Sequence, residues 1–197
     1  MDATPTRSVV LELMDERRAM HEGYVFLDEK CLLLAGEMLR EVGRHSELRR
    51  RFDAAWDAAI AALQAAVARH GLEALQVHPA QPLESAAVER RPRSLMGVRL
   101  QEAALDAAEA PPPPAVDRSP ESEACRGAFA RVAERAAPLA AAGGNLERLS
   151  REYRRAVRRA RALSDVLLPE LDRDVRVIET RLEELEQVDA IVMRRGR

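Results

Sequence analysis

The sequence predicts an all-α chain in which an N-terminal and a C-terminal helix form a long antiparallel two-helix coiled coil. Three observations support this. Apolar residues recur every three and four positions along two long stretches, one near each end. Eight of the eleven prolines lie between Pro79 and Pro120, which separates the two stretches. Aromatic residues make up only 3% of the chain and charged residues 32%, a mixture typical of long helices.

The first helix is expected to occupy residues 1–75. Thr6 or Ser8 can cap its start, and Gly71 offers a stop that the following residues would extend. The heptad register starts at Val10 and is broken by Arg17, Glu41, His45 and Arg69. Its representative seam positions are Leu13, Met20, Leu27 and Leu34.

Residues 76–118 are expected to form a short Pro-rich connection, because prolines exclude a long helix there. Within it, Ser94–Leu100 fits a short strand with a bulge or hairpin turn at Gly97. Pro111–Pro114 should form a stiff polyproline spacer.

The second helix is expected over residues 119–197, with Ser119 as its cap and Pro120 at the first helical position. Gly143-Gly144-Asn145 should interrupt or weaken it, since two glycines cost about 2 kcal/mol relative to alanines. The seam on this helix includes Leu163, Leu167, Ile178, Leu182 and Leu185.

An irregularity is predicted near Pro169. Proline removes the amide that would bond the carbonyl of Asp165. The apolar spacing also changes there to successive fours, from Leu163 to Val175, which locally unwinds a left-handed supercoil. The sequence therefore predicts a bend or a straighter segment at this place.

The connection between the helices is long enough for the chain to fold back on itself. This gives an antiparallel pair within one chain, while a parallel homodimer is the main alternative. The Pro-rich middle favours the intramolecular pair, since it lies where the turn would be.

No motif for phosphate binding, zinc binding or nucleophilic catalysis is present in the sequence. We therefore expect a protein that is not an enzyme and needs no cofactor or metal. A net charge of −2 provides no overall field that favours nucleic acid. No apolar run approaches the ~20 residues of a membrane span. We expect a soluble, cytoplasmic protein that inserts into no membrane directly.

Two surfaces are candidates for partner binding. If residue 10 lies opposite about residue 190, then Arg148–Arg161 lies beside positions 39–52, and the two groups form a basic girdle. The girdle is expected to dock an acidic partner, the alternative being a hydrated arginine-rich face. Its residues are Arg49, Arg50, Arg51, Arg154, Arg155, Arg158 and Arg159. A second surface consists of apolar residues off the seam, namely Val25, Phe26, Leu32 and Leu33.

Several segments together resemble the D subunit of V-type/A-type rotary ATPases. The most specific similarity is to the C-terminal helix of that protein, and the central Leu95-Met96-Gly97-Val98 also matches. The segments that carry the resemblance are Arg158–Leu163, Val166–Leu171, Ile178–Glu186, Thr6–Leu13 and Gly23–Leu34.

The resemblance implies a non-catalytic central rotor shaft that couples ATP hydrolysis or synthesis to proton or sodium transport. In that family the paired termini enter the catalytic A/B hexamer, the small F subunit binds at mid-shaft, and a socket subunit (C/d) on the membrane ring holds the far end. The girdle would then dock the F subunit, and the apolar surface would be a bearing inside the hexamer. Pro169 would set the curvature of the shaft. A coiled-coil adaptor or chaperone unrelated to rotary motors is the alternative.

Overall fold

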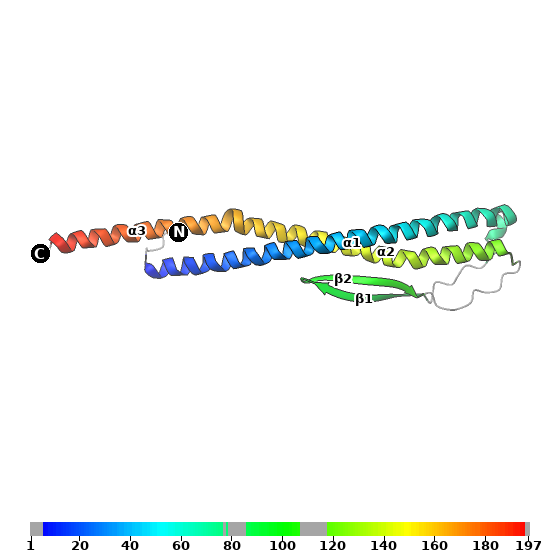
Figure 1. Ribbon diagram of the computed structural model, residues 1–197, viewed down its shortest axis with the longest axis horizontal. Helices are drawn as coiled ribbons and strands as arrows, with labels where there is room; N and C mark the ends of the chain where they lie inside the picture. Colours follow the sequence, from blue (N-terminus) through cyan, green and yellow to red (C-terminus); the bar gives the residue numbers. More distant parts are fainter. Residues whose placement is uncertain (1–5, 77, 79–85, 107–117, 196–197) are drawn as a thin grey trace. The chain divides into compact units, whose positions relative to one another are not determined.

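The computed structural model describes residues 6–76, 78, 86–106 and 118–195. Helix α1 spans Arg7–Leu75 and is followed by strands β1 (Ala87–Leu95) and β2 (Val98–Asp106). Helix α2 (Pro120–Ala162), a π-helical turn η1 (Leu163–Leu167) and helix α3 (Leu168–Arg195) complete the chain (Figure 1). The predicted all-α architecture is confirmed, with a small β-sheet in the insert.

The chain divides into two compact units. Unit 1 consists of Met1–Leu33 and Glu152–Arg197, and unit 2 of Leu34–Arg151. Helices α1 and α2 each contribute to both units. Within the described part of the chain, no helix is long and apolar enough to cross a membrane.

Unit 1 is an antiparallel pair formed by the first part of α1 and the C-terminal helices. Its direction follows from two contacts at its two ends. Arg7 pairs with Glu186 at 2.7 Å, and Lys30 pairs with Glu152 at 2.6 Å. The chain therefore pairs with itself in antiparallel fashion, as predicted. The buried apolar side chains of this unit are Val10, Ala156, Ala160 and Val175.

Most of the expected seam positions of unit 1 are at least partly shielded, including Leu13, Met20, Leu27, Leu163, Ile178 and Leu182. Leu167 and Leu185 differ from the expected seam, since their exposed fractions are 40% and 50%. Leu167 lies in the π-helical turn, where the extra residue shifts the register. Leu185 lies next to Glu186, which pairs with Arg7. Helix α1 begins at Arg7, so Leu185 lies level with the start of α1.

The π-helical turn is the form taken by the irregularity predicted near Pro169. The backbone amide of Leu168 donates to the carbonyl of Leu163, five residues back. Pro169 follows as the second residue of α3. Because proline has no amide hydrogen and crowds the preceding turn, a widened turn accommodates it without breaking the helix.

Unit 2 contains a second antiparallel helix pair with small residues at its centre. Ala59 of α1 packs with Ala128 and Val132 of α2. Leu34 and Leu149 are fully buried. Small side chains let two helix backbones approach closely, which explains how a chain with few aromatic residues still forms a packed interior here.

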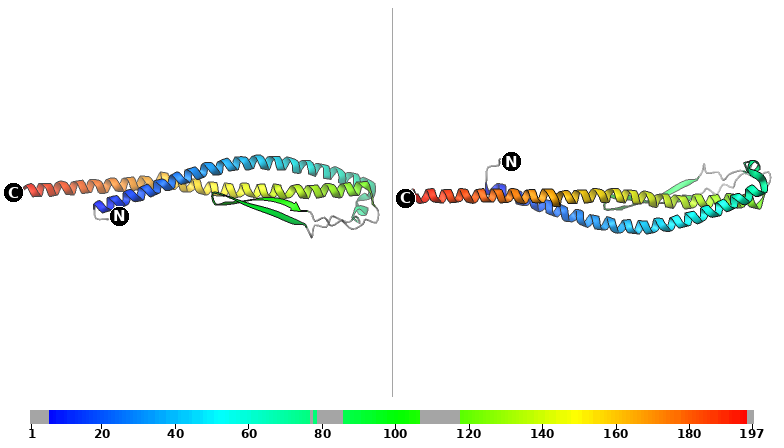
Figure 2. Two further views of the ribbon diagram at one scale, coloured as in Figure 1. Left: turned by 60° about the horizontal axis from the view of Figure 1, so that its bottom comes forward. Right: turned by 90° about the horizontal axis from the view of Figure 1, so that it is seen from above.

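The β-hairpin lies alongside the helix pair of unit 2 (Figure 2). Strands β1 and β2 pair in an antiparallel register that matches Leu95 with Val98. Met96 and Gly97 form the connecting turn, with φ angles of 48° and 84°. Positive φ at both central residues is the mark of a type I′ turn, which glycine favours at its second position. The predicted turn at Gly97 is thus present, and both strands are longer than the expected segment.

The expectation of a break at Gly143-Gly144-Asn145 is wrong, because α2 continues through these residues. Tertiary packing outweighs the low helix propensity of the glycines. Asn145 is only 1% exposed. A Cβ added at Gly143 would lie 3.9 Å from His45 Nε2, so the other helix packs directly against this position. The backbone instead departs from helical geometry at Gly71, whose φ of 76° lies in the left-handed region, although one further turn follows.

Candidate partner-binding surfaces

The arginines of the expected girdle fall into two groups with different surroundings. The first group, Arg49, Arg50 and Arg51, lies on α1 in unit 2. Arg49 pairs with Asp53 at 2.9 Å, while Arg50 and Arg51 both pair with Glu47. Their charge is therefore largely balanced by neighbours on the same helix, which leaves little attraction for an acidic partner.

The second group lies on α2 in unit 1 and consists of Arg154, Arg155, Arg158 and Arg159. All four are exposed, and none pairs with a carboxylate among the residues that the structure describes. Glu152, the nearest acid in this segment, is engaged by Lys30 at 2.6 Å. The hydrogen bond from Lys30 lowers the pKa of Glu152, and the charges of Arg155 and Arg159 lower it further.

The expected register of the girdle is wrong, because contacts within unit 1 place the second group opposite another segment of α1. Gly23 lies against Leu163, and Lys30 pairs with Glu152, so the four arginines between them lie opposite residues 23–30. The register expected from the sequence places them beside positions 39–52 instead. We therefore treat Arg154, Arg155, Arg158 and Arg159 separately, as the unit-1 arginine face.

The apolar residues expected to form a bearing surface are exposed, and all belong to unit 1. The exposed fractions are 41% for Val25, 57% for Phe26, 70% for Leu32 and 51% for Leu33. Large apolar side chains grouped in this way are characteristic of protein–protein contacts. Val25 and Phe26 lie in the segment opposite the unit-1 arginine face, whereas Leu32 and Leu33 follow that segment.

A buried polar cluster in unit 2 was missed by the sequence reasoning. Arg93 of β1 donates from Nη2 to Glu37 Oε1 at 2.5 Å and to Glu41 Oε1 at 2.9 Å. The side chains of Glu37 and Glu41 are only 5% and 2% exposed. Charge-assisted hydrogen bonds of this kind are stronger than neutral ones, and Arg93 thereby ties the hairpin to α1.

Asn145 attaches the second strand of the hairpin to α2. Its side-chain amide accepts from the backbone amide of Gln101 and donates to the carbonyl of the same residue, both at 2.9 Å. This is the pattern that a neighbouring strand would provide. Gln101 pairs with Pro92 across the hairpin. The proline, which lacks an amide hydrogen, stands at the corresponding position on the outer edge, where it hinders pairing with a further strand.

The electrostatics of this cluster favour the ionised carboxylates. Burial alone would raise the pKa of Glu37, but hydrogen bonds from Arg40 and Arg93 outweigh it and hold that pKa below its ordinary value. The hydrogen bond to Glu37 raises the pKa of Arg93 against the opposing effect of burial. At the rim, Arg44 bonds to Glu102 at 2.7 Å and lowers the pKa of Glu102.

Two signals in the sequence pointed to these residues without revealing their role. Glu41 is a charged residue at a seam position, and Asn145 is a polar residue beside two glycines. Their partners lie 52 and 44 residues away, so spacing along the helix could not identify them.

These features define a class: a protein of antiparallel helix pairs, one of which anchors a β-hairpin. Among the described residues, no group of three or more His, Cys, Asp or Glu side chains could hold a metal ion.

Comparison with known proteins identifies the family. The chain belongs to the ATP synthase D-subunit family, whose model matches residues 10–195. It is 24% identical over 196 residues to the D subunit of the V-type ATP synthase of Thermotoga neapolitana, an alignment that covers 99% of this chain and 97% of that protein. The resemblance drawn from the sequence is thereby confirmed.

Proposed function

We propose that this chain is the central rotor shaft of a V/A-type ATPase or ATP synthase. In this role it couples ATP hydrolysis or synthesis in the A/B hexamer to rotation of the membrane ring and to proton or sodium transport. The observation that carries the proposal is the family match over residues 10–195. The antiparallel helix pair of each unit supports it, because two helices packed along a seam resist bending and twisting better than one.

In this proposal the chain catalyses nothing itself and acts in the cytoplasm, at the membrane periphery, as part of the complex. ATP hydrolysis belongs to the A/B hexamer, and the chain transmits the resulting motion. Unit 2 would bind the socket subunit (C/d) on the membrane ring.

The unit-1 arginine face is the proposed dock for the F subunit. Its four guanidinium groups have no carboxylate partner within the described residues, so an acidic surface would gain charge-assisted contacts there. Arg49, Arg50 and Arg51 are a weaker candidate, since Glu47 and Asp53 already engage them.

Val25, Phe26, Leu32 and Leu33 are proposed as a bearing surface inside the hexamer. Apolar contact is non-directional, so it can hold a turning shaft without fixing it at one angle. Val25 and Phe26 lie at the level of the arginine face in unit 1, so at that level the two partners would approach different sides of the helix pair.

Pro169 and the π-helical turn are proposed to give the shaft its asymmetry. The test is Pro169→Ala, with Pro138→Ala in α2 as the matched control. The first change should alter the ratio of ions pumped to ATP hydrolysed in reconstituted vesicles, and the second should not. Unchanged coupling in Pro169→Ala would remove this element of the proposal.

The assembly itself is tested by co-expression with the A, B and F subunits, followed by size-exclusion chromatography and an ATPase assay. We expect one copy of the chain per hexamer, with the F subunit attached and turnover altered. A stable free species or homodimer with no affinity for the hexamer would favour the adaptor or chaperone function.

A further inference from the structure

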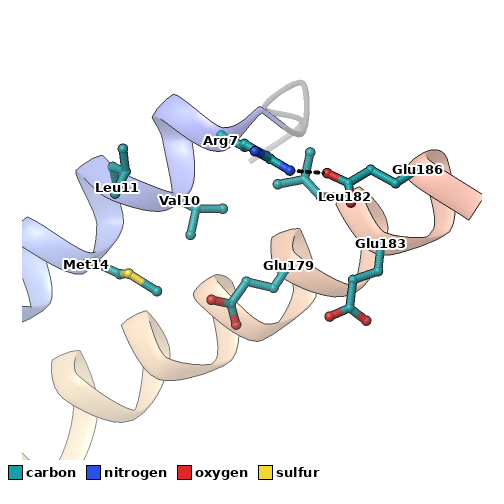
Figure 3. Close-up of a pocket in the computed structure, with 8 residues that line it drawn as sticks. All are labelled: Arg7, Val10, Leu11, Met14, Glu179, Leu182, Glu183 and Glu186. Atoms are coloured by element: carbon teal, nitrogen blue, oxygen red, sulfur yellow. Dashed lines mark hydrogen bonds and ion pairs between the residues drawn. The ribbon is translucent and has the colours of Figure 1, made fainter.

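An open groove lies between the N-terminal part of α1 and helix α3 in unit 1 (Figure 3). Its volume is about 380 Å³. Its apolar lining comes from both helices and consists of Val10, Leu11, Met14 and Leu182. Its polar lining consists of Arg7, Glu179, Glu183 and Glu186.

The described parts of the two helices extend to different levels beside the groove. Helix α1 begins at Arg7, which pairs with Glu186, whereas α3 continues to Arg195. Leu11 and Met14, which line the groove from α1, are 63% and 42% exposed. The apolar surface continues along α3 beyond the groove, through Leu185, Val188 and Val192, which are also exposed.

The carboxylates of the groove are poorly compensated. Glu179 and Glu183 lie four residues apart on one helix, a spacing at which like charges repel. Among the described residues, Glu186 is the groove carboxylate that forms an ion pair, and its partner is Arg7. Three carboxylates thus face one guanidinium, an arrangement that destabilises the free chain slightly and that a cationic occupant would relieve.

We infer that this groove binds a segment of a neighbouring subunit that presents an aliphatic side chain with an arginine or lysine beside it. The aliphatic group would cover Met14 and Leu182 and gain free energy by leaving water. The cation would pair with Glu179 and Glu183. Charge complementarity selects this occupant, since an acidic segment would be repelled by the same carboxylates.

The inference rests on the proposed function, because the occupant is expected to come from the A/B hexamer. It adds a contact whose chemistry differs from that of the bearing surface at Val25, Phe26, Leu32 and Leu33. The bearing surface was identified by its apolar side chains alone, whereas the groove combines an apolar floor with an anionic wall.

Photocrosslinking in the reconstituted complex tests the occupant. Benzoylphenylalanine replaces Met14 in one variant and Val177 in the control. Val177 is 43% exposed, against 42% for Met14, and lines a different face of α3 together with Arg176, Arg181 and Glu184. We expect the Met14 probe to capture a hexamer segment with an arginine or lysine within about four residues of an aliphatic side chain. Capture of an acidic segment, of residues 1–5 of this chain, or of nothing beyond the Val177 control would overturn the inference.

Charge variants provide a second readout. The double change Glu179→Gln and Glu183→Gln should weaken binding to the A/B hexamer about threefold per charge at low salt, as expected for exposed ion pairs. The difference should vanish at about 1 M salt. Glu184→Gln, which removes one charge outside the groove, is the control, and it should leave the affinity unchanged. Equal affinities of the double variant and the control would contradict the inference.

Failure of the inference and failure of the proposed function have different signatures. If the unmodified chain forms no complex with the A/B hexamer, the proposed function is wrong. If the complex forms but the Met14 probe and the charge variants behave as their controls do, only the assignment of the groove is wrong. The double variant removes a like-charge repulsion, so it should fold at least as stably as the parent chain.

Discussion

Units 1 and 2 are both antiparallel helix pairs, yet they are held together differently. The buried polar side chains of the described residues all lie in unit 2, and they are Glu37, Glu41, Ser119, Ser122 and Asn145. Unit 2 also contains the fully buried Leu34 and Leu149. In unit 1 the buried apolar side chains are Val10, Ala156, Ala160 and Val175, the larger seam residues are partly exposed, and ion pairs add to the contact.

The two units differ in their polar side chains, some of which are buried in unit 2 and none of which is buried among the described residues of unit 1. In unit 2, specific polar contacts hold the hairpin on the helices, and loss of one partner leaves a buried group unsatisfied. In unit 1, the unpaired arginines, the exposed apolar residues and the groove all remain on the surface. Unit 2 is thus ordered by internal polar contacts, and unit 1 carries the surfaces that we propose for partners.

The largest effect is expected from removing a buried side chain in unit 2. Leu149→Ala should lower the free energy of unfolding by about 3 kcal/mol, because it leaves a cavity in a fully shielded position. Leu163→Ala in unit 1 should cost about half as much, since that position is only partly buried and its surroundings can relax. Urea denaturation followed by circular dichroism measures both. Equal losses would contradict the contrast between the units.

The next effect concerns the attachment of the hairpin. Arg93→Ala should cost about 2 kcal/mol, because the buried Glu37 and Glu41 each lose a charged partner. Arg91→Ala is the control on the same strand, since its side chain is 83% exposed, and it should cost little. Hydrogen exchange at β2 amides should accelerate only in the first variant. Unchanged protection would mean that Asn145 alone holds the hairpin.

A smaller effect is expected at the unit-1 arginine face. The triple change Arg154→Glu, Arg155→Glu and Arg158→Glu should weaken binding of the F subunit about tenfold, because the side chains lack competing carboxylates. The same reversal at Arg49, Arg50 and Arg51 should have a smaller effect, since those arginines are already paired. Titration by isothermal calorimetry at low and high salt measures both. Retention of the F subunit by both variants at both salt concentrations would remove the arginines from the interface.

The smallest effect is a pH dependence. The pKa of Glu37 is lower in the folded chain, so its stabilising contribution is present above the ordinary value of 4.5 and is lost as pH falls below it. Hydrogen exchange of the hairpin, corrected for intrinsic rates, should therefore reveal weaker protection on acidification from about pH 6 to about pH 3.5. In Arg93→Ala this pH dependence should shrink, because one cause of the shift is absent. An identical pH dependence of hairpin protection in the parent chain and in Arg93→Ala would show that Arg93 does not cause the pH dependence.

The periodic part of the fold could be predicted from the sequence. Regular apolar spacing located both long helices, and Gly97 located the hairpin turn. Strand β1 was largely missed, because Val88–Arg93 is charged, contains Pro92 and shows no alternation of apolar residues. Its structure depends on pairing with β2 and on contacts with α1, which local propensity does not contain.

The site was predicted less completely. Exposure of the apolar residues from Val25 to Leu33 followed from their positions off the seam. The girdle failed as one band because the apolar spacing locates the seam on each helix but does not fix which residues face each other across it, so Arg154–Arg159 lie opposite residues 23–30 and not 39–52. Glu41 and Asn145 were treated as irregularities, since only folding brings them to Arg93 and Gln101.

The most direct test of the central claim is observation of rotation in single immobilised complexes. A bead can be attached through Arg90→Cys on the exposed strand β1. Burial raises the pKa of the Cys31 and Cys125 thiols, so both should react more slowly with the label than the introduced cysteine. With the A/B hexamer held on the surface, the rotor account predicts that ATP drives the bead in one direction. A bead that stays fixed while the same complexes hydrolyse ATP would contradict it.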